Sequence, residues 1–272
     1  MSQKTSLELQ LALKKLYRPA ANSHKGQNGK LLIIGGSELF HAASKWSLDI
    51  ASKIVDMVFY SSVPSNNRLV QEAKQSFWGG IVIKRSHLNN YIVEADAILI
   101  GPGMDRSFYT KFLVNRLLRR YPEKKWVIDA GALQMVNPKL LNVMHIITPH
   151  HQEMALLKNK DPRFDEENYQ ANCYCLLKGQ KDKVFAPHNK EIIEVTGGNA
   201  GMTKGGTGDV LAGLLAAFYC KNDALTSALV ASHINKKAGE NLYQQQGQYF
   251  NSSDLVDTIP MVLWDELKPN YS

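Results

Sequence analysis

Residues 30–37 read Lys-Leu-Leu-Ile-Ile-Gly-Gly-Ser, an apolar run that two glycines and a serine end abruptly. A short apolar run bounded by turn residues is typical of a strand buried in a sheet. Similar runs recur along the chain at 57–60, 81–83, 97–100, 126–128 and 145–147. The sequence therefore predicts a sheet of short, buried strands.

The segments between these runs favour helices. From Phe108 to Tyr121, apolar residues recur every three or four positions, as on one face of an amphipathic helix. Two later runs, 184–186 and 191–195, lie close enough for an antiparallel hairpin. Strands that alternate with helices indicate a parallel sheet covered on both faces. We predict an α/β fold of three α/β/α layers with a mostly parallel central sheet, forming one domain over 1–272, with 1–20 as a leading helix.

Several predicted strands end in the same way, in glycine, proline or polar residues. Because ligands of open parallel sheets bind beyond the carboxyl ends of the strands, these endings predict one shared functional rim. They are GGS (35–37), GPG (101–103), DAG (129–131), TPH (148–150) and LKG (177–179).

The stretch GGNAGMTKGGTGDVLAG (197–213) carries the strongest chemical signal. Gly205, Gly206, Thr207 and Gly208 lead directly into an apolar helical segment. Glycines let the backbone approach a ligand, and the N–H groups at a helix start form an anion site. We expect these four residues to form an anion hole for a phosphoryl group.

Asp209 follows the four residues of this expected anion hole, in the first turn of the predicted helix. A carboxylate at this place can accept a proton from a hydroxyl that attacks phosphorus. It can also simply cap the helix. Because a cap needs no run of glycines, we favour Asp209 as a catalytic base. Neither Gly-x4-Gly-Lys-[Ser/Thr] nor a strand-associated Gly-x-Gly-x-x-Gly occurs in the sequence.

Charge and composition narrow the possible partners. The formal net charge of +7 suits an anionic ligand, but the basic residues are spread along the chain and form no aromatic-basic tract, so we expect no nucleic acid. No stretch of ~18 apolar residues occurs, so we expect no membrane span and a cytoplasmic protein.

The three cysteines, Cys173, Cys175 and Cys220, favour buried thiols over a disulfide or zinc site. His150-His151-x-Glu153 lacks the spacing of a metal motif, so we predict no protein-bound metal.

The glycine stretch, extended to NAGMTKGGTGDVLAGLLAAF (199–218), resembles the signature of the ADP/ATP-dependent NAD(P)H-hydrate dehydratases, which are ribokinase-like proteins. Other segments agree with that family in the same order, so the resemblance covers roughly residues 20–262. They are HKGQNGKLLIIGGS (24–37), IGPGM (100–104), VIDAGAL (127–133), TPHHQEMALL (148–157), LLKG (176–179) and NSSDLVDTIP (251–260).

The resemblance implies repair of hydrated NADH or NADPH (NADHX, NADPHX), in which ADP or ATP, with Mg2+ bridging the phosphate oxygens, activates the ring hydroxyl so that phosphate leaves. It also implies a homotetramer. The resemblance assigns Asp209 as the base. It implies nucleotide binding by Lys178, Gly179, Asn199 and Gly208, and contacts to the hydrated dinucleotide from Ala42, Gly103, His150 and Asp209.

Several of these residues can also have purely structural roles. His150 can cap a helix, Gly103 can serve a turn, Lys178 can be solvated, and Asp129, at a strand end, can serve either function or turn chemistry.

The chain departs from the family pattern at Gly131, where a second acid is usual, at His151-Gln152, at Ala200 and at Lys204. Lys204 can lie beside the phosphate or point into solvent. The segment before the match leaves no room for the epimerase domain that some family members carry, so we expect none. A small-molecule kinase of the same superfamily and a catalytically silent nucleotide-binding protein are the alternatives.

Overall fold

The computed structural model describes residues 3–189 and 191–268. Its strands form one sheet in the order β3-β2-β1-β4-β5-β6-β7-β8-β9. All neighbours from β3 to β7 pair in parallel, and β7, β8 and β9 pair antiparallel. The strands are β1 (Lys30–Ile34), β2 (Met57–Ser61), β3 (Ile81–Val82), β4 (Ala97–Ile100), β5 (Lys125–Ile128), β6 (His145–Ile147), β7 (Tyr174–Leu177), β8 (Asp182–Phe185) and β9 (Ile192–Val195).

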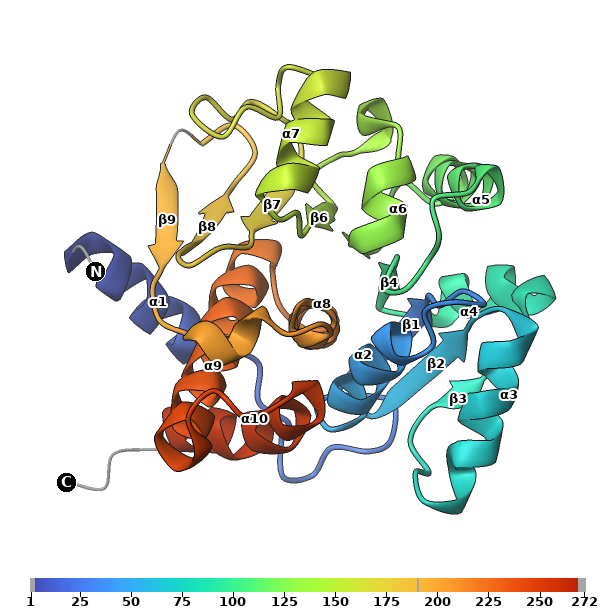
Figure 1. Cartoon of the computed structure of the whole chain (residues 1–272), viewed down its shortest axis with the longest axis horizontal. Coiled ribbons are helices and arrows are strands. Elements are labelled where there is room, and N and C mark those ends of the chain that lie inside the picture. The colour runs from blue at the N-terminus through green and yellow to red at the C-terminus, as the bar shows by residue number, and fades with distance from the viewer. Residues whose placement is uncertain (1–2, 190, 269–272) are drawn as a thin grey trace.

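Helices cover both faces of this sheet (Figure 1). One face packs against α1 (Gln3–Lys15), α2 (Ala42–Ser52), α3 (Pro64–Glu72), α8 (Thr207–Tyr219), α9 (Ala224–Gln246) and α10 (Ser252–Leu267). The other packs against α4 (Leu88–Glu94), α5 (Phe108–Arg120), α6 (Ala130–Met135) and α7 (His151–Lys160). Successive strand residues serve opposite cores: Leu31 and Ile33 face the first, and Leu32 and Ile34 face the second.

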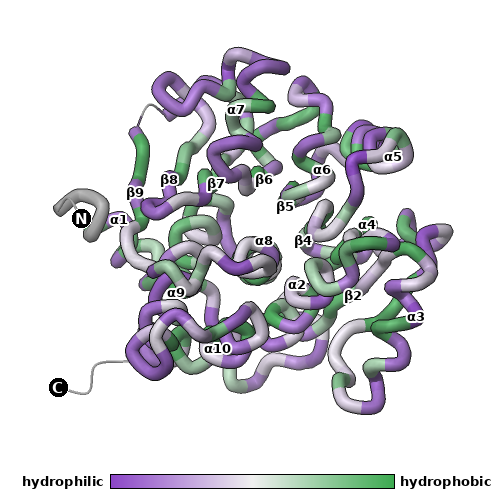
Figure 2. Tube along the Cα trace, in the orientation of Figure 1, coloured by the Kyte–Doolittle hydropathy of each residue, from purple (hydrophilic) through white to green (hydrophobic). Residues whose placement is uncertain are grey.

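Helix α8 lies at the centre of the first layer. All ten residues from Val210 to Tyr219 are buried, and the hydropathy colouring marks much of this helix as apolar (Figure 2). A Cβ on Gly213 would come within 2.7 Å of the backbone of Ser47, so α2 and α8 approach closely. The Ser47 hydroxyl donates to the carbonyl of Asp209 at 2.8 Å. Helix α2 therefore fixes where α8 begins.

The predicted three-layer α/β fold is confirmed, including the hairpin of β8 and β9. The predicted leading helix corresponds to α1, which is shorter than the 1–20 range and contacts α9; residues 1–2 lie outside the described part. The three cysteines are buried free thiols, as expected. Among the described residues, no helix combines the length and apolar character needed to cross a membrane.

Candidate active site

The carboxyl ends of the parallel strands meet along one edge of the sheet, as the strand endings predict. Gly35 follows β1, Gly101 follows β4, Asp129 follows β5, Thr148 follows β6 and Lys178 follows β7. These strands are hydrogen-bonded neighbours, so their ends lie in a row at a spacing of about 4.8 Å. The N-terminus of α8 brings Asp209 to the same edge. This position is indicated by the electrostatic interaction of Asp209 with both Asp129 and Lys178.

Helix α8 begins without a side-chain cap. Helices α5, α7, α9 and α10 each start at a residue whose side chain accepts from a first-turn N–H. At α8 the N-cap is Gly206, in the left-handed conformation with φ of +96°. Within the described part of the chain, the N–H groups of Gly205, Gly206, Gly208 and Asp209 donate to no other residue. This helix start can therefore receive an anion.

The residues of the expected anion hole differ in their surroundings. A Cβ on Gly206 would lie 2.2 Å from the Trp46 ring, so only glycine fits there. A Cβ on Gly208 would meet the Lys178 ammonium at 3.5 Å, and Gly205 has open space beside it. The Thr207 hydroxyl donates to the carbonyl of Met202 at 2.7 Å and so fastens the loop.

The half-buried Lys178 and the buried Asp129 form an ion pair on the rim. The Lys178 Nζ lies 2.7 Å from Asp129 Oδ1, which also accepts from the Thr148 hydroxyl at 2.7 Å. Burial disfavours the Lys178 ammonium, but the carboxylates of Asp129, Glu153 and Asp209 outweigh that effect and raise its pKa. Lys178 is therefore charged beside the anion site, and the Asp129 carboxylate serves this pair rather than capping the helix that it precedes.

Asp209 has a strongly perturbed carboxyl group. Burial, and then the negative charge of Asp129, raise the pKa of Asp209 to about 7; Lys178 opposes this change and Glu153 adds to it. Asp209 occupies the third residue of α8 and not the N-cap. A carboxylate whose pKa lies near neutrality suits a general base. The structure thus supplies a base beside a free helix start.

A cavity of about 630 Å³ adjoins this helix start. Lys178, Gly179, Asn199 and Gly208, the residues expected to bind nucleotide, all line it. The Asn199 side chain is fixed by a bond to the Gly239 carbonyl at 2.8 Å, and it accepts from the Gly201 N–H at 2.9 Å. The volume falls in the range of ordinary small-molecule sites.

Sequence reasoning missed the residues that hold this cavity open. The buried Lys236 donates to the carbonyls of Gly179 at 3.1 Å, Gln180 at 3.2 Å and Gly197 at 3.4 Å, and it lies 3.3 Å from Asp182 Oδ1. Asp182 accepts from the Gly179 N–H at 2.9 Å. Lys236 comes from the middle of α9 and has no local motif, so no signal in the sequence identifies it.

The residues expected to contact the dinucleotide lie elsewhere on the rim. Ala42 is the exposed first residue of α2. Gly103, with φ of +70°, approaches the β1–α2 loop, where a Cβ would come within 2.9 Å of the Phe40 carbonyl. His150 caps α7 by accepting from the Glu153 N–H at 3.2 Å, and its side chain is 49% exposed. None of the three lines the 630 Å³ cavity. Their role toward a substrate stays a prediction.

Two departures from the family pattern have local explanations. A Cβ on Gly131 would lie 2.0 Å from the Met104 carbonyl, so this backbone leaves no space for a second acid. Lys204 neither lies at the anion site nor points freely into solvent, the two possibilities considered from the sequence. Its ammonium donates to the carbonyls of Gln248 and Phe250. No explanation for Ala200 or His151-Gln152 emerges from their contacts.

The fold belongs to the ribokinase-like class. A ribokinase-like superfamily protein from Enterococcus faecalis V583 superposes with a TM-score of 0.83, covering 96% of this chain and 95% of that one at 20% identity. At the level of sequence, the chain belongs to the NAD(P)H-hydrate dehydratase family, whose family model matches residues 31–261.

Two relatives show the extent of the match. The bifunctional NAD(P)H-hydrate repair enzyme Nnr of Methanocaldococcus jannaschii is 37% identical over 260 residues, which cover 92% of this chain but 51% of that protein. The chain thus spans about half the length of this relative. The ADP-dependent (S)-NAD(P)H-hydrate dehydratase of Nitrosopumilus maritimus is 30% identical, with coverage of 97% of this chain and 98% of that protein.

Proposed function

We propose that this protein dehydrates hydrated NADH or NADPH to NAD(P)H with ADP or ATP as the phosphoryl donor, and so acts as a carbon–oxygen lyase. The observation that carries the proposal is Asp209, a half-buried carboxyl with a raised pKa at the uncapped start of α8. The membership of the NAD(P)H-hydrate dehydratase family supports the choice of substrate.

The nucleotide would occupy the cavity lined by Lys178, Gly179, Asn199 and Gly208, with its terminal phosphate toward the free N–H groups at the start of α8. These are the N–H groups of Gly205, Gly206, Gly208 and Asp209, whereas the Thr207 N–H donates to the Lys204 carbonyl at 3.4 Å. Those N–H groups and the Lys178 ammonium stabilise the negative charge that grows on the transferring phosphoryl group. The two sources of positive potential are fixed before the nucleotide arrives, one by the helix and the other by Asp129.

Asp209 acts on the substrate hydroxyl. Its carboxylate takes the hydroxyl proton while the oxygen attacks the terminal phosphorus and the nucleotide leaves with one phosphate fewer. The ring carbon–oxygen bond then breaks, inorganic phosphate departs with the bond electrons, and loss of a proton from the neighbouring carbon forms the ring double bond. Phosphorylation thus turns a poor leaving group into a good one.

Mg2+ fits this site as an ion carried by the nucleotide. Among the described residues, no three His, Cys, Asp or Glu side chains gather to hold a metal ion. Mg2+ commonly binds through phosphates and one or two carboxylates, and Asp129 would supply one of these. When bound, the ion neutralises phosphate charge.

The test is the absorbance at 340 nm when the purified protein meets NADHX or NADPHX with ADP, with ATP and with neither. We expect a nucleotide-dependent rise that Asp209→Asn abolishes. Glu167→Gln, which changes an exposed carboxyl outside the site, serves as the control and should leave the rise intact. Folded protein that gives no rise with either nucleotide would refute the proposal.

The same base and anion hole suit a small-molecule kinase of this superfamily. Phosphorus NMR of the reaction mixture separates the two activities, since a kinase leaves a stable phosphate ester and a dehydratase releases inorganic phosphate. A silent nucleotide-binding protein would give neither product, and its affinity for ATP would be the same in the wild type and in the Asp209→Asn variant.

We also propose that the protein is a cytoplasmic homotetramer that binds no nucleic acid. The support is the resemblance to the dehydratase family, a compartment where its proposed substrates occur and, for the last point, the dispersed basic residues. Light scattering coupled to gel filtration tests the oligomeric state, and fractionation of cells tests the location.

A further inference from the structure

A second hollow lies on the same rim, beyond β2 and β3. It is a groove of about 830 Å³ lined by residues that follow these two strands, among them Ser62, Arg68, Lys84 and Arg85. Because β2 and β3 run parallel to β1, the groove opens on the edge of the sheet that carries Asp129 and Lys178.

The lining of this basic groove has one sign of charge. Arg68, Lys84 and Arg85 contribute three cations, and His87 lies beside them. Among the described residues that line the groove there is no aspartate or glutamate. A hollow whose charged lining residues are all cations concentrates anions. One carboxylate, that of Asp105 in the adjoining cavity, interacts electrostatically with Arg85.

Arg85 is held in place but is only partly satisfied. Its Nε donates to the Ser62 carbonyl at 3.2 Å, and its guanidinium carbon lies 5.5 Å from the centre of the Tyr109 ring. Its Nη1 is buried and has no hydrogen-bond partner, and the same is true of the Ser62 hydroxyl. A buried donor without an acceptor costs about 1–3 kcal/mol, so these groups are suited to an acceptor that comes from outside the chain.

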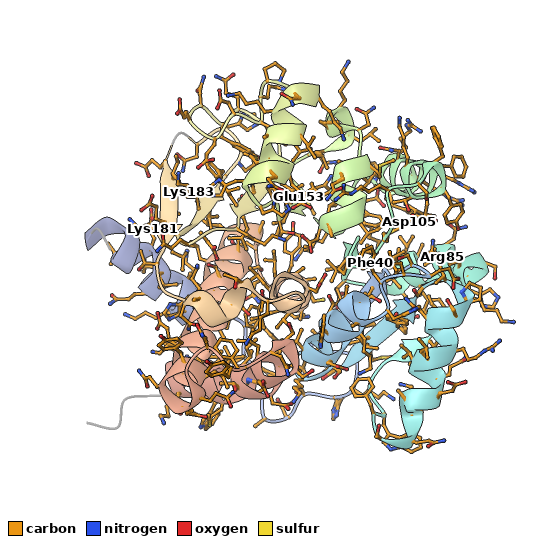
Figure 3. All side chains as sticks on the ribbon, in the orientation of Figure 1. Phe40, Arg85, Asp105, Glu153, Lys181 and Lys183 are labelled. Atoms are coloured by element: carbon orange, nitrogen blue, oxygen red, sulfur yellow. The ribbon has the colours of Figure 1, made fainter. Side chains whose placement is uncertain are left out.

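The groove is continuous with the region expected to hold the dinucleotide. Arg85 and Tyr109 also line a smaller cavity of about 210 Å³, whose other walls include Gly36, Phe40 and Asp105. A Cβ on Gly103 would meet Gly36 and Phe40, as well as Ala43. In Figure 3, Phe40, Arg85 and Asp105 lie near one another. The smaller cavity therefore lies between the surroundings of Gly103 and the groove, with which it shares Arg85 and Tyr109.

We propose that the basic groove receives the 2′-phosphate that distinguishes hydrated NADPH from hydrated NADH, and that the protein prefers the phosphorylated dinucleotide. This inference rests on the proposed function. With the reacting ring near Asp209 and Asp129, the other end of the dinucleotide extends toward β2, three strand positions from β5, or about 14 Å. The Arg85 guanidinium can donate a charge-assisted hydrogen bond to a phosphate oxygen from a nitrogen that the Ser62 carbonyl does not engage.

The first test is the ratio of kcat/KM for NADPHX to that for NADHX. Arg85→Gln should lower this ratio about tenfold, the effect of losing one charge-assisted hydrogen bond. Lys84→Gln should lower this ratio about threefold. Because Lys84 is exposed, this variant should fold normally even if Arg85→Gln does not. Arg119→Gln removes an exposed charge from α5 and should leave the ratio at its wild-type value. An unchanged ratio in both groove variants overturns the proposal.

The second test does not depend on turnover. Calorimetry on protein saturated with ATP should show that adenosine 2′,5′-bisphosphate binds more tightly than 5′-AMP, and that Arg85→Gln removes the difference. Equal binding of the two ligands overturns the proposal. So does displacement of the bisphosphate by equimolar inorganic phosphate, which would mark a general anion site. Selective binding without dehydratase activity would retain the groove and refute the proposed reaction.

Discussion

Replacing Asp209 by asparagine should stabilise the protein while it abolishes turnover. Burial and Asp129 raise the pKa of Asp209 from its ordinary value of 3.8 to about 7. The folded state therefore binds a proton more tightly than the unfolded chain does. The stability that this carboxyl contributes is complete below pH ~3.8, and it is lost as the pH rises through about 7. Asparagine has no charge to lose, so the variant escapes this loss.

The size of the effect follows from the same two pKa values. At ~1.4 kcal/mol per pKa unit, Asp209→Asn should raise the free energy of unfolding by up to about 4 kcal/mol at pH 8. The gain should shrink to about 2 kcal/mol at pH 5 and to nearly zero at pH 3. These are upper values, since the start of α8 favours a negative charge and the site can relax.

The assay is urea unfolding of the wild-type and variant proteins at pH 8 and pH 5, with Glu167→Gln as an exposed control that should change little at either pH. The alternative, in which Asp209 merely supports the helix start, predicts the opposite sign. Loss of a favourable charge near the helix dipole would then destabilise the variant by about 0.5–1 kcal/mol at pH 8. A destabilised variant, or a gain that does not shrink in acid, would refute the reasoning.

The neighbouring residues allow three further predictions. Gly206→Ala should destabilise the fold by about 3 kcal/mol, because its Cβ would meet Trp46 at 2.2 Å at a positive φ. Gly208→Ala should leave the melting temperature near the wild-type value while raising the KM for nucleotide about tenfold, since its Cβ meets only Lys178, at 3.5 Å, inside the cavity; equal loss of stability in both variants would contradict this contrast. The pH profile of kcat/KM should rise around pH 7, where Asp209 ionises. Asp129→Asn removes a repelling carboxylate and should move the midpoint of this rise about one pH unit lower, whereas a fixed midpoint would assign the titration to another group. Lys178→Met should weaken ADP binding about tenfold by calorimetry, whereas Lys181→Met, three residues on and 61% exposed, should not; similar losses in both would mean that general charge, not position, attracts the nucleotide.

The sequence predicts the layers and the rim well because both depend on local patterns. The run 30–34 and the glycines after it appear as β1 and its turn, and the LKG ending brings Lys178 to the rim as expected. Glycine-rich 205–208 likewise predicts an open helix start, since the left-handed conformation of Gly206 is a local reason for glycine. The contact with Trp46, which also requires glycine at 206, is not visible in the sequence.

Ion pairs and hydrogen bonds between residues far apart in the sequence cannot be predicted from local patterns. From the sequence, Asp129 suited function and turn chemistry equally. Only the folded chain places it 2.7 Å from a lysine that lies 49 residues away. Lys204 is a second example, because the sequence left open whether it lies beside the phosphate or points into solvent. Its ammonium instead binds the carbonyls of Gln248 and Phe250. Neither the partner nor the direction of a side chain follows from spacing along the chain.

The Lys236 ammonium has a consequence for how the cavity responds to its ligand. It binds both the turn at Gly179–Gln180 and the loop at Gly197, so one buried cation on α9 connects two segments that line the cavity. A site that is already assembled loses little conformational entropy on binding. The nucleotide should therefore bind to a site that is already formed. The observed rate of association should show a single phase that depends on nucleotide concentration, without a later folding step.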